Sequence, residues 1–174
     1  RGWFDPAVIV AALSAVVSAA AFIELSSRVE HPILELGLFR SVEFAAANLL
    51  AVVANGAMFA TWLLVPSLLV GQLGASLVIS GLVLAASPAA TAAASSLAGR
   101  SSGRTASWSL GAVGLFIEGL GMIGLSQVDA TWSAAHIALL MAVVGGGLGL
   151  FSVPNMATVM QGVGIDKQGV AGGL

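Results

Sequence analysis

The chain of 174 residues has no cysteine and no tyrosine, and only six basic residues. Without cysteine it forms no disulfide bond and offers no thiolate to a metal ion. Without tyrosine it has no phenolic side chain for acid–base chemistry. A nucleic-acid-binding domain usually carries a basic patch or stripe, and six scattered basic residues do not provide one. We therefore expect no nucleic-acid partner.

Charged residues of both signs are scarce. They make up 8% of the chain, whereas hydrophobic residues make up 58%, and an ordinary soluble domain is about 25% charged. The composition predicts an integral membrane protein whose partner is the lipid bilayer. The two histidines, His31 and His136, are far apart in sequence, and the chain has no HExxH or GxSxG motif. We expect no metal, no cofactor and no enzymatic activity.

Long uncharged stretches dominate the rest of the sequence. Residues 44–99 contain no Asp, Glu, Lys or Arg, and the chain is apolar again up to Asp129 apart from Glu118. About 20 apolar residues cross the hydrocarbon core of a bilayer. The sequence predicts an all-α protein with five membrane-spanning helices, at residues 6–26, 44–70, 77–98, 105–125 and 134–156.

A short basic loop at residues 98–104 separates two of these apolar stretches. Loops rich in Lys and Arg stay on the cytoplasmic side of a membrane. With five spans, the loops at 24–43, 99–104 and 160–169 lie on one side and hold five basic residues, whereas the other side holds only Arg1. We predict that these three loops are cytoplasmic. The five basic residues are Arg28, Arg40, Arg100, Arg104 and Lys167.

The second predicted span contains a candidate substrate-binding face. Asn48, Asn55 and Trp62 are spaced by seven residues, or two helical turns, so they share a face, and Met58 and Phe59 lie on or beside it. A surface of amide, thioether and aromatic groups suits varied amphipathic ligands. The alternative is that the asparagines form hydrogen bonds between helices and that Trp62 serves packing.

Glycine and proline interrupt the third and fifth predicted spans. Pro88 lies in the middle of the third, and the fifth contains Gly145, Gly147, Gly149 and Pro154. Proline kinks a helix and glycine weakens it, so these residues are candidate bending points. Glycines spaced in this way also allow two helices to approach closely, and close packing alone remains an alternative.

Glu118 is the only acid in the interior of a predicted span, since Glu24 lies near the end of the first span, where the charged connection begins. An ionised carboxylate that faces lipid is costly, so it should face protein or water. Gly111, Gly114 and Gly121 fall on the same helical face, where a neighbouring helix can approach. One hypothesis is a site for a proton or a cationic substrate. The alternative is a neutral acid that donates a structural hydrogen bond.

Several short motifs occur in an order that resembles the fourteen-span drug:proton antiporters of the major facilitator superfamily. The resemblance covers nearly the whole chain. Its motifs are Gly2-Trp3, residues 30–36 leading to Leu38-Phe39-Arg40, Val65-Pro66, Gly74-Ala75-Ser76, residues 81–84 before Pro88, the glycine–arginine loop, residues 145–149 before Pro154, and residues 169–174.

The resemblance implies a place for each part of the chain. Residues 1–43 would be the last of two extra central helices with a charged cytoplasmic connection. Residues 44–174 would be four helices of the C-terminal six-helix bundle and the start of a fifth. We expect the chain to be an excerpt of a longer transporter of the bacterial inner membrane, whose N-terminal bundle lies outside it.

The resemblance also implies a function, namely export of amphipathic compounds driven by protons. Arg100, Gly103 and Arg104 would belong to a loop that controls conformational change. The family loop has an Asp before its Arg and Gly, and this sequence has no acid there, so a salt-bridge latch is in doubt. The alternatives are transport of a lipid, siderophore or metabolite, or a helical subunit without transport activity.

Overall fold

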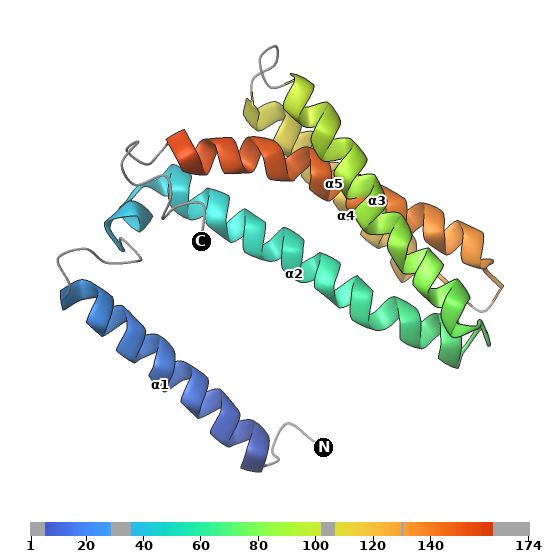
Figure 1. Ribbon diagram of the computed structural model, residues 1–174, viewed down its shortest axis with the longest axis horizontal. Coiled ribbons are helices and arrows are strands. Elements are labelled where there is room, and N and C mark those ends of the chain that lie inside the picture. Colours follow the sequence, from blue (N-terminus) through green and yellow to red (C-terminus); the bar gives the residue numbers. More distant parts are fainter. Residues whose placement is uncertain (1–5, 29–35, 102–106, 130, 162–174) are drawn as a thin grey trace.

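The computed structural model describes residues 6–28, 36–101, 107–129 and 131–161. Five long helices account for most of these residues (Figure 1), and each contains an apolar stretch long enough to cross a bilayer. The predicted all-α membrane fold with five spans is therefore confirmed. The helices are α1 (Pro6–Arg28), α2 (Val42–Gly71), α3 (Leu77–Ser101), α4 (Ser107–Ser126) and α5 (Ala134–Gln161), and a short 3₁₀ helix, η1 (Leu36–Arg40), precedes α2.

Local signals explain where α2 begins and ends. The Ser41 hydroxyl accepts a hydrogen bond from the backbone N–H of Phe44, which caps the helix. Glu43 lies in the first turn, where a negative charge is favourable. After Gly71 the chain turns through Gly74, whose φ of 64° is a left-handed conformation that favours glycine.

Helices α3 and α5 show the largest extensions beyond their predicted C-terminal ends. Helix α3 continues to Ser101, so residues 98–101 are helical and do not belong to a loop. Helix α5 continues to Gln161, beyond the expected end at 156. In both cases a buried side chain in the last turns explains the difference: Ala98 is 1% exposed, and Val159 packs against α2. Gly103, Arg104, residues 29–35 and the predicted loop after residue 161 lie outside the described residues.

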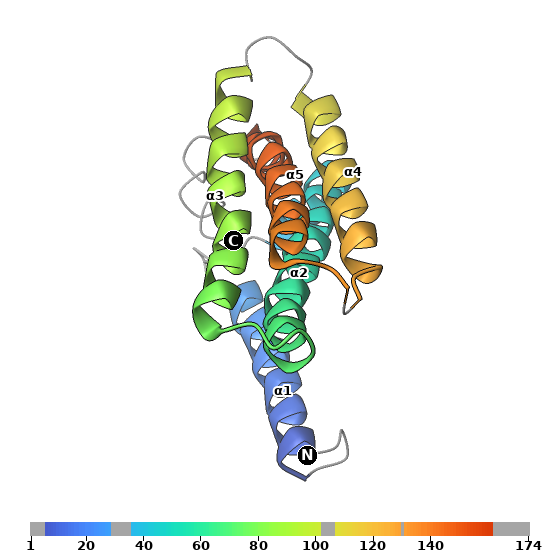
Figure 2. The same cartoon turned by 90° about the vertical axis from the view of Figure 1, so that its right-hand side faces the viewer.

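Helix α5 is the centre of the bundle. It lies between α3 and α4 (Figure 2), and α2 runs along the same group. Glycines make the approach close on both sides of α5. A Cβ added to Gly145 would lie 2.7 Å from the Ser87 Oγ of α3, and a Cβ added to Gly147 would lie 2.6 Å from the Gly114 carbonyl oxygen of α4. The glycine stretch therefore packs backbone against backbone.

Hydroxyl groups of α3 also bind α5. The Thr91 hydroxyl donates to the Gly145 carbonyl oxygen at 2.8 Å, and the Ser95 hydroxyl donates to the Gly149 carbonyl oxygen at 3.2 Å. Such contacts hold helices together inside a membrane, where burial of apolar surface provides little driving force.

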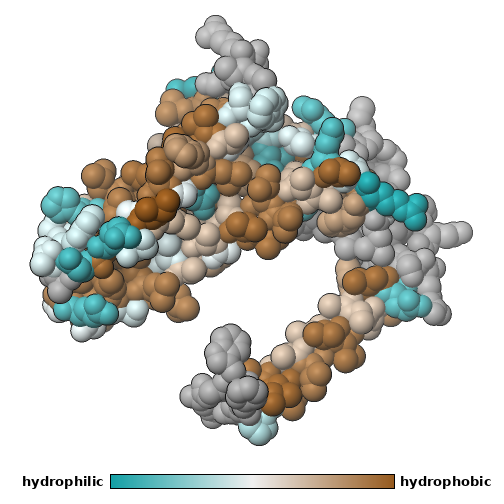
Figure 3. All heavy atoms as spheres, turned by 180° about the vertical axis from the view of Figure 1, so that it is seen from behind, coloured by the Kyte–Doolittle hydropathy of each residue, from teal (hydrophilic) through white to brown (hydrophobic). Residues whose placement is uncertain are grey.

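Helix α1 stands apart from the other four (Figure 1), and its described side chains are all exposed. Apolar side chains cover α1 and much of the visible face of the bundle, while hydrophilic residues gather towards the helix ends (Figure 3). An apolar belt with polar ends is the surface that a bilayer requires.

Candidate functional site

The five residues of the predicted substrate face all lie on α2. Asn48 is half-buried and Asn55 is exposed, and both donate their amide hydrogens within their own helix. The Asn48 Nδ2 lies 2.9 Å from the Phe44 carbonyl oxygen, and the Asn55 Nδ2 lies 2.8 Å from the Ala51 carbonyl oxygen. The Asn48 and Asn55 amides thus bond to their own helix. The alternative interpretation requires hydrogen bonds from these asparagines to another helix, and the described residues show none.

The other three residues of the predicted substrate face differ in exposure. Met58 is half-buried against a cluster that contains Ala54, and its sulfur accepts a hydrogen bond from the Ser87 hydroxyl at 3.9 Å. Phe59 and Trp62 are exposed, with ring centroids 6.0 Å apart and the rings edge to face. Asn55, Phe59 and Trp62 therefore form an exposed polar–aromatic strip, and its role in substrate binding stays a prediction.

Glu118 is buried on α4, on the face that also carries Gly114 and Gly121 and packs against α5. Its side chain is 3% exposed, and neither carboxyl oxygen has a hydrogen-bond partner among the described residues. Helix α5 approaches its backbone closely, because a Cβ added to Gly147 would lie 2.8 Å from the Glu118 Cα. The hydrogen bond of the structural alternative is thus not formed within this part of the chain.

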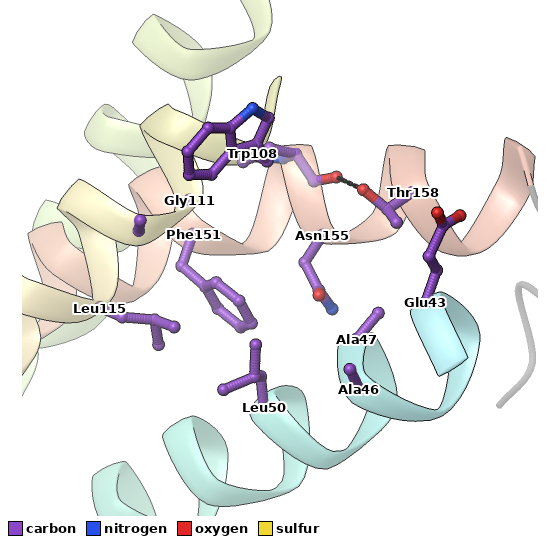
Figure 4. Close-up of a pocket in the computed structure, with 12 residues that line it drawn as sticks. Glu43, Ala46, Ala47, Leu50, Trp108, Gly111, Leu115, Phe151, Asn155 and Thr158 are labelled. Carbon is purple, nitrogen blue, oxygen red and sulfur yellow. Dashed lines mark hydrogen bonds between the residues drawn. The ribbon is translucent and has the colours of Figure 1, made fainter. Parts of the chain in front are cut away.

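A cavity of about 310 Å³, cavity 1, lies between the start of α2, the start of α4 and the end of α5. Figure 4 shows the Phe151 ring, Leu50 and Leu115 along its inner wall and Glu43, Asn155 and Thr158 towards its other end. The Thr158 hydroxyl donates to the Pro154 carbonyl oxygen at 3.0 Å. Cavity 1 is lined by Glu43, Ala46, Ala47, Leu50, Trp108, Gly111, Ala112, Leu115, Phe151, Pro154, Asn155 and Thr158.

A second cavity of about 430 Å³, cavity 2, lies at the opposite end of α2 and α4. It is bounded by the C-terminal half of α2 and the end of α4. Its polar groups are two hydroxyls from α2, the Gln72 amide directly after α2, and one hydroxyl from α4. Cavity 2 is lined by Thr61, Leu64, Val65, Ser67, Leu68, Gln72, Met122, Leu125, Ser126 and Val128.

Glu118 is placed between the two cavities by the spacing along α4. Leu115, three residues before it, is the innermost α4 residue of cavity 1, and Met122, four residues after it, is the innermost α4 residue of cavity 2. Residues three and four apart share a helical face. We call this face, with the side of α2 opposite it, the α2–α4 seam. None of the five residues predicted as the substrate face lines either cavity.

Sequence reasoning missed the polar residues of cavity 1. Asn155 was a usable signal, because it is a polar residue that directly follows Pro154 inside an apolar stretch. Glu43 and Thr158 gave no such signal, since each lies near a helix end, where polar residues are ordinary. Glu43 and Thr158 lie at the same cavity only because α2 and α5 pack antiparallel.

The remaining predicted residues are scattered. Pro88 is exposed on α3, Arg100 is exposed near the end of α3, and Pro154 is buried against cavity 1. Within the described ranges, no three metal-ligating side chains lie close enough together to hold an ion. A role of these prolines and of the α5 glycines in bending stays a prediction.

The chain is similar to several curated bacterial transporters. It is 31% identical to a protein of Escherichia coli named Uncharacterized transporter YebQ, over 88% of this chain and 34% of that protein. It is 28% identical to Multidrug resistance protein Stp of Mycobacterium tuberculosis, over 99% of this chain and 32% of that protein. It is 29% identical to Uncharacterized MFS-type transporter YvkA of Bacillus subtilis, over 88% of this chain and 34% of that protein.

The chain thus spans about a third of the length of the curated relatives that it matches. No protein-family model matches it, and no solved structure matches it. Five helices able to span a membrane and an alignment with transporters along nearly all of its length describe a multi-pass bacterial membrane protein. On these grounds the chain belongs to the major facilitator superfamily of membrane transporters.

Proposed function

We propose that the chain is part of a secondary transporter that exports amphipathic organic compounds, preferably cationic ones, in exchange for protons. The observation that carries this proposal is cavity 1, a mainly apolar chamber with aromatic walls and one carboxylate. Binding sites for small organic molecules have this character, with many apolar contacts and few polar groups.

The residues of cavity 1 match the two parts of such a substrate. Phe151 and Trp108 provide aromatic surface for an apolar body, and the face of a tryptophan attracts a cation. Glu43 provides the negative charge that a protonated amine requires. Support also comes from the relative that is named a multidrug resistance protein.

The whole transporter is also part of the proposal. We assign residues 44–161 to the C-terminal bundle and α1 to an additional central helix, as in the fourteen-span drug:proton antiporters. A separate N-terminal bundle would complete the substrate path, and the exposed strip of Asn55, Phe59 and Trp62 would face it. Rocking of two bundles about a central site is the usual mechanism of such transporters.

The test uses the full-length transporter in proteoliposomes with an imposed pH gradient. We expect uptake of an amphipathic organic cation, such as ethidium, to depend on the gradient, and the added cation to release protons. Glu43→Gln should weaken transport of ethidium more than transport of a neutral drug. Transport that is indifferent to the gradient, or absent for every amphipathic compound, would contradict the proposal.

A further inference from the structure

The α2–α4 seam has an unusual arrangement of space and charge. Two cavities lie along it at opposite ends, and one buried carboxyl lies between their innermost residues, Leu115 and Met122. Helices α2 and α4 run in the same direction, so cavity 1 adjoins the start of both helices and cavity 2 adjoins the end of both. The two cavities therefore approach Glu118 from opposite sides of the membrane.

No other charge in these helices is close to Glu118 along the chain. The other titratable side chains of α2 to α5 are Glu43, Arg100 and His136. Each lies in the first or last turn of its helix, whereas Glu118 lies in the interior of α4. A buried carboxylate without a partner is strongly unfavourable. The site therefore needs a positive charge from outside, and the smallest one is a proton.

We propose that the α2–α4 seam is a proton path through this bundle, with Glu118 as its single relay between cavity 1 and cavity 2. The inference rests on the proposed proton-coupled function and deepens it, because it names the path and the carrier. Water in one cavity gives a proton to a Glu118 carboxyl oxygen, and the carboxyl later gives that proton to water in the other cavity. No other bond is made or broken.

The geometry explains why such a path would not leak. Leu115 and Met122 each line one cavity, whereas Glu118 lines neither and is buried in the described arrangement. Proton exchange with either side therefore requires a small displacement of α2 or α4. Helix α4 is held tightly against α5 by Gly114, Gly121 and Gly147. Helix α2 has no such glycine contact, because a Cβ added to Gly56 would meet nothing within 4 Å, and we infer that α2 is the element that moves.

The first test measures access from each side and needs no transport. The chain contains no cysteine, so Leu115→Cys and Met122→Cys can be introduced singly into a full-length transporter without other cysteines. A membrane-impermeant cationic thiosulfonate should modify the first from the side where α2 starts and the second from the opposite side. Val113→Cys is the matched control, because Val113 is 51% exposed on the outer face of α4 and should meet lipid.

Two outcomes of this labelling would overturn the path. In one, both cysteines react from the same side only. In the other, neither reacts faster than the control. We expect Leu115→Cys and Met122→Cys each to be modified at a rate at least an order of magnitude above that of Val113→Cys. The two should react from opposite sides of the membrane.

The second test identifies the carrier chemically. Dicyclohexylcarbodiimide reacts with a protonated carboxyl in apolar surroundings: a carboxyl oxygen bonds to the central carbon, and the carboxyl proton moves to a carbodiimide nitrogen. We expect mass spectrometry to find the adduct on Glu118 and its yield to fall as pH rises. No adduct at any pH would overturn the assignment of Glu118.

The third test separates coupling from substrate binding. Glu118→Gln keeps the size of the side chain but does not titrate. It should abolish gradient-driven uptake while leaving exchange of labelled for unlabelled ethidium at its original rate, and Glu118→Asp should recover part of the uptake. Loss of exchange as well, in a variant that remains folded, would refute the relay. If labelling and the adduct behave as expected but no drug is transported, the path stands and the proposed substrate class fails.

Discussion

Gly147 and Gly146 are neighbours on α5 with opposite surroundings. A Cβ on Gly147 would lie 2.6 Å from the Gly114 carbonyl oxygen and 2.8 Å from the Glu118 Cα, whereas a Cβ on Gly146 would meet nothing within 4 Å. Backbone atoms cannot yield as the end of a flexible side chain can. The same chemical change therefore has opposite consequences at the two positions.

We predict that Gly147→Ala destabilises the full-length transporter and that Gly146→Ala does not. Overpacking of a tight interior costs roughly 1–3 kcal/mol, while alanine is favoured over glycine in a helix by about 1 kcal/mol. Unfolding in mixed detergent micelles should resolve the two variants. Equal stability of both would show that α4 and α5 are not in backbone contact.

Asp129, in the turn between α4 and α5, supports a prediction about pH. Hydrogen bonds from the Thr131 side chain and backbone N–H lower the pKa of this carboxyl, because they favour its ionised form. Since the pKa is lower in the folded turn, the contribution to stability is present above the ordinary pKa of aspartate and is lost as pH falls through the lowered value. Thr131→Ala should raise the Asp129 pKa towards its ordinary value, which carboxyl carbon NMR would measure. An unchanged pKa would contradict the hydrogen bond from the Thr131 side chain, because the backbone N–H remains in the variant.

At the scale of the helix, α3 and α5 are joined by hydroxyl groups. Thr91 and Ser95 lie one turn apart on α3 and reach carbonyl oxygens one turn apart on α5. This register brings Ser87 against Gly145 and Thr91 against Gly149. A shift of one residue along either helix would break both hydrogen bonds and would place side chains against backbone.

Thr91→Ala should therefore weaken the pair of helices, by about 0.6–2 kcal/mol as for other hydrogen bonds between membrane helices. Thr91→Ser keeps the donor and is the matched control. Unfolding in mixed detergent micelles measures the difference in stability between the two variants. If alanine and serine are equally stable at this position, the hydroxyl contributes only packing.

Particular helices show what sequence reasoning can and cannot reach. All five spans are predictable, because the thickness of the bilayer fixes the length of each apolar stretch. The ends of α3 and α5 are not, because they depend on the burial of Ala98 and Val159 against other helices. Glu118 stands out as a lone acid in an apolar stretch, but its two cavities exist only where α2 lies beside α4. That juxtaposition is a property of the packed bundle.

At the scale of the whole molecule, the orientation in the membrane can be tested. We predict that Ser101→Cys and Gln127→Cys, at opposite ends of the α3–α4 region, react with an impermeant thiol reagent from opposite sides. The side of Ser101 should be cytoplasmic, because basic residues concentrate there. Reaction of both from one side would contradict five crossings.

The glycines of α5 have a consequence for the gene. Every missense change of a glycine codon adds at least a Cβ, because no amino acid has a smaller side chain than glycine. Codons 145, 147 and 149, whose Cβ positions are filled by α3 or α4, should tolerate no missense change in a saturation library selected for drug resistance. Codons 56, 81 and 146 have open space at the same atom and should accept small residues.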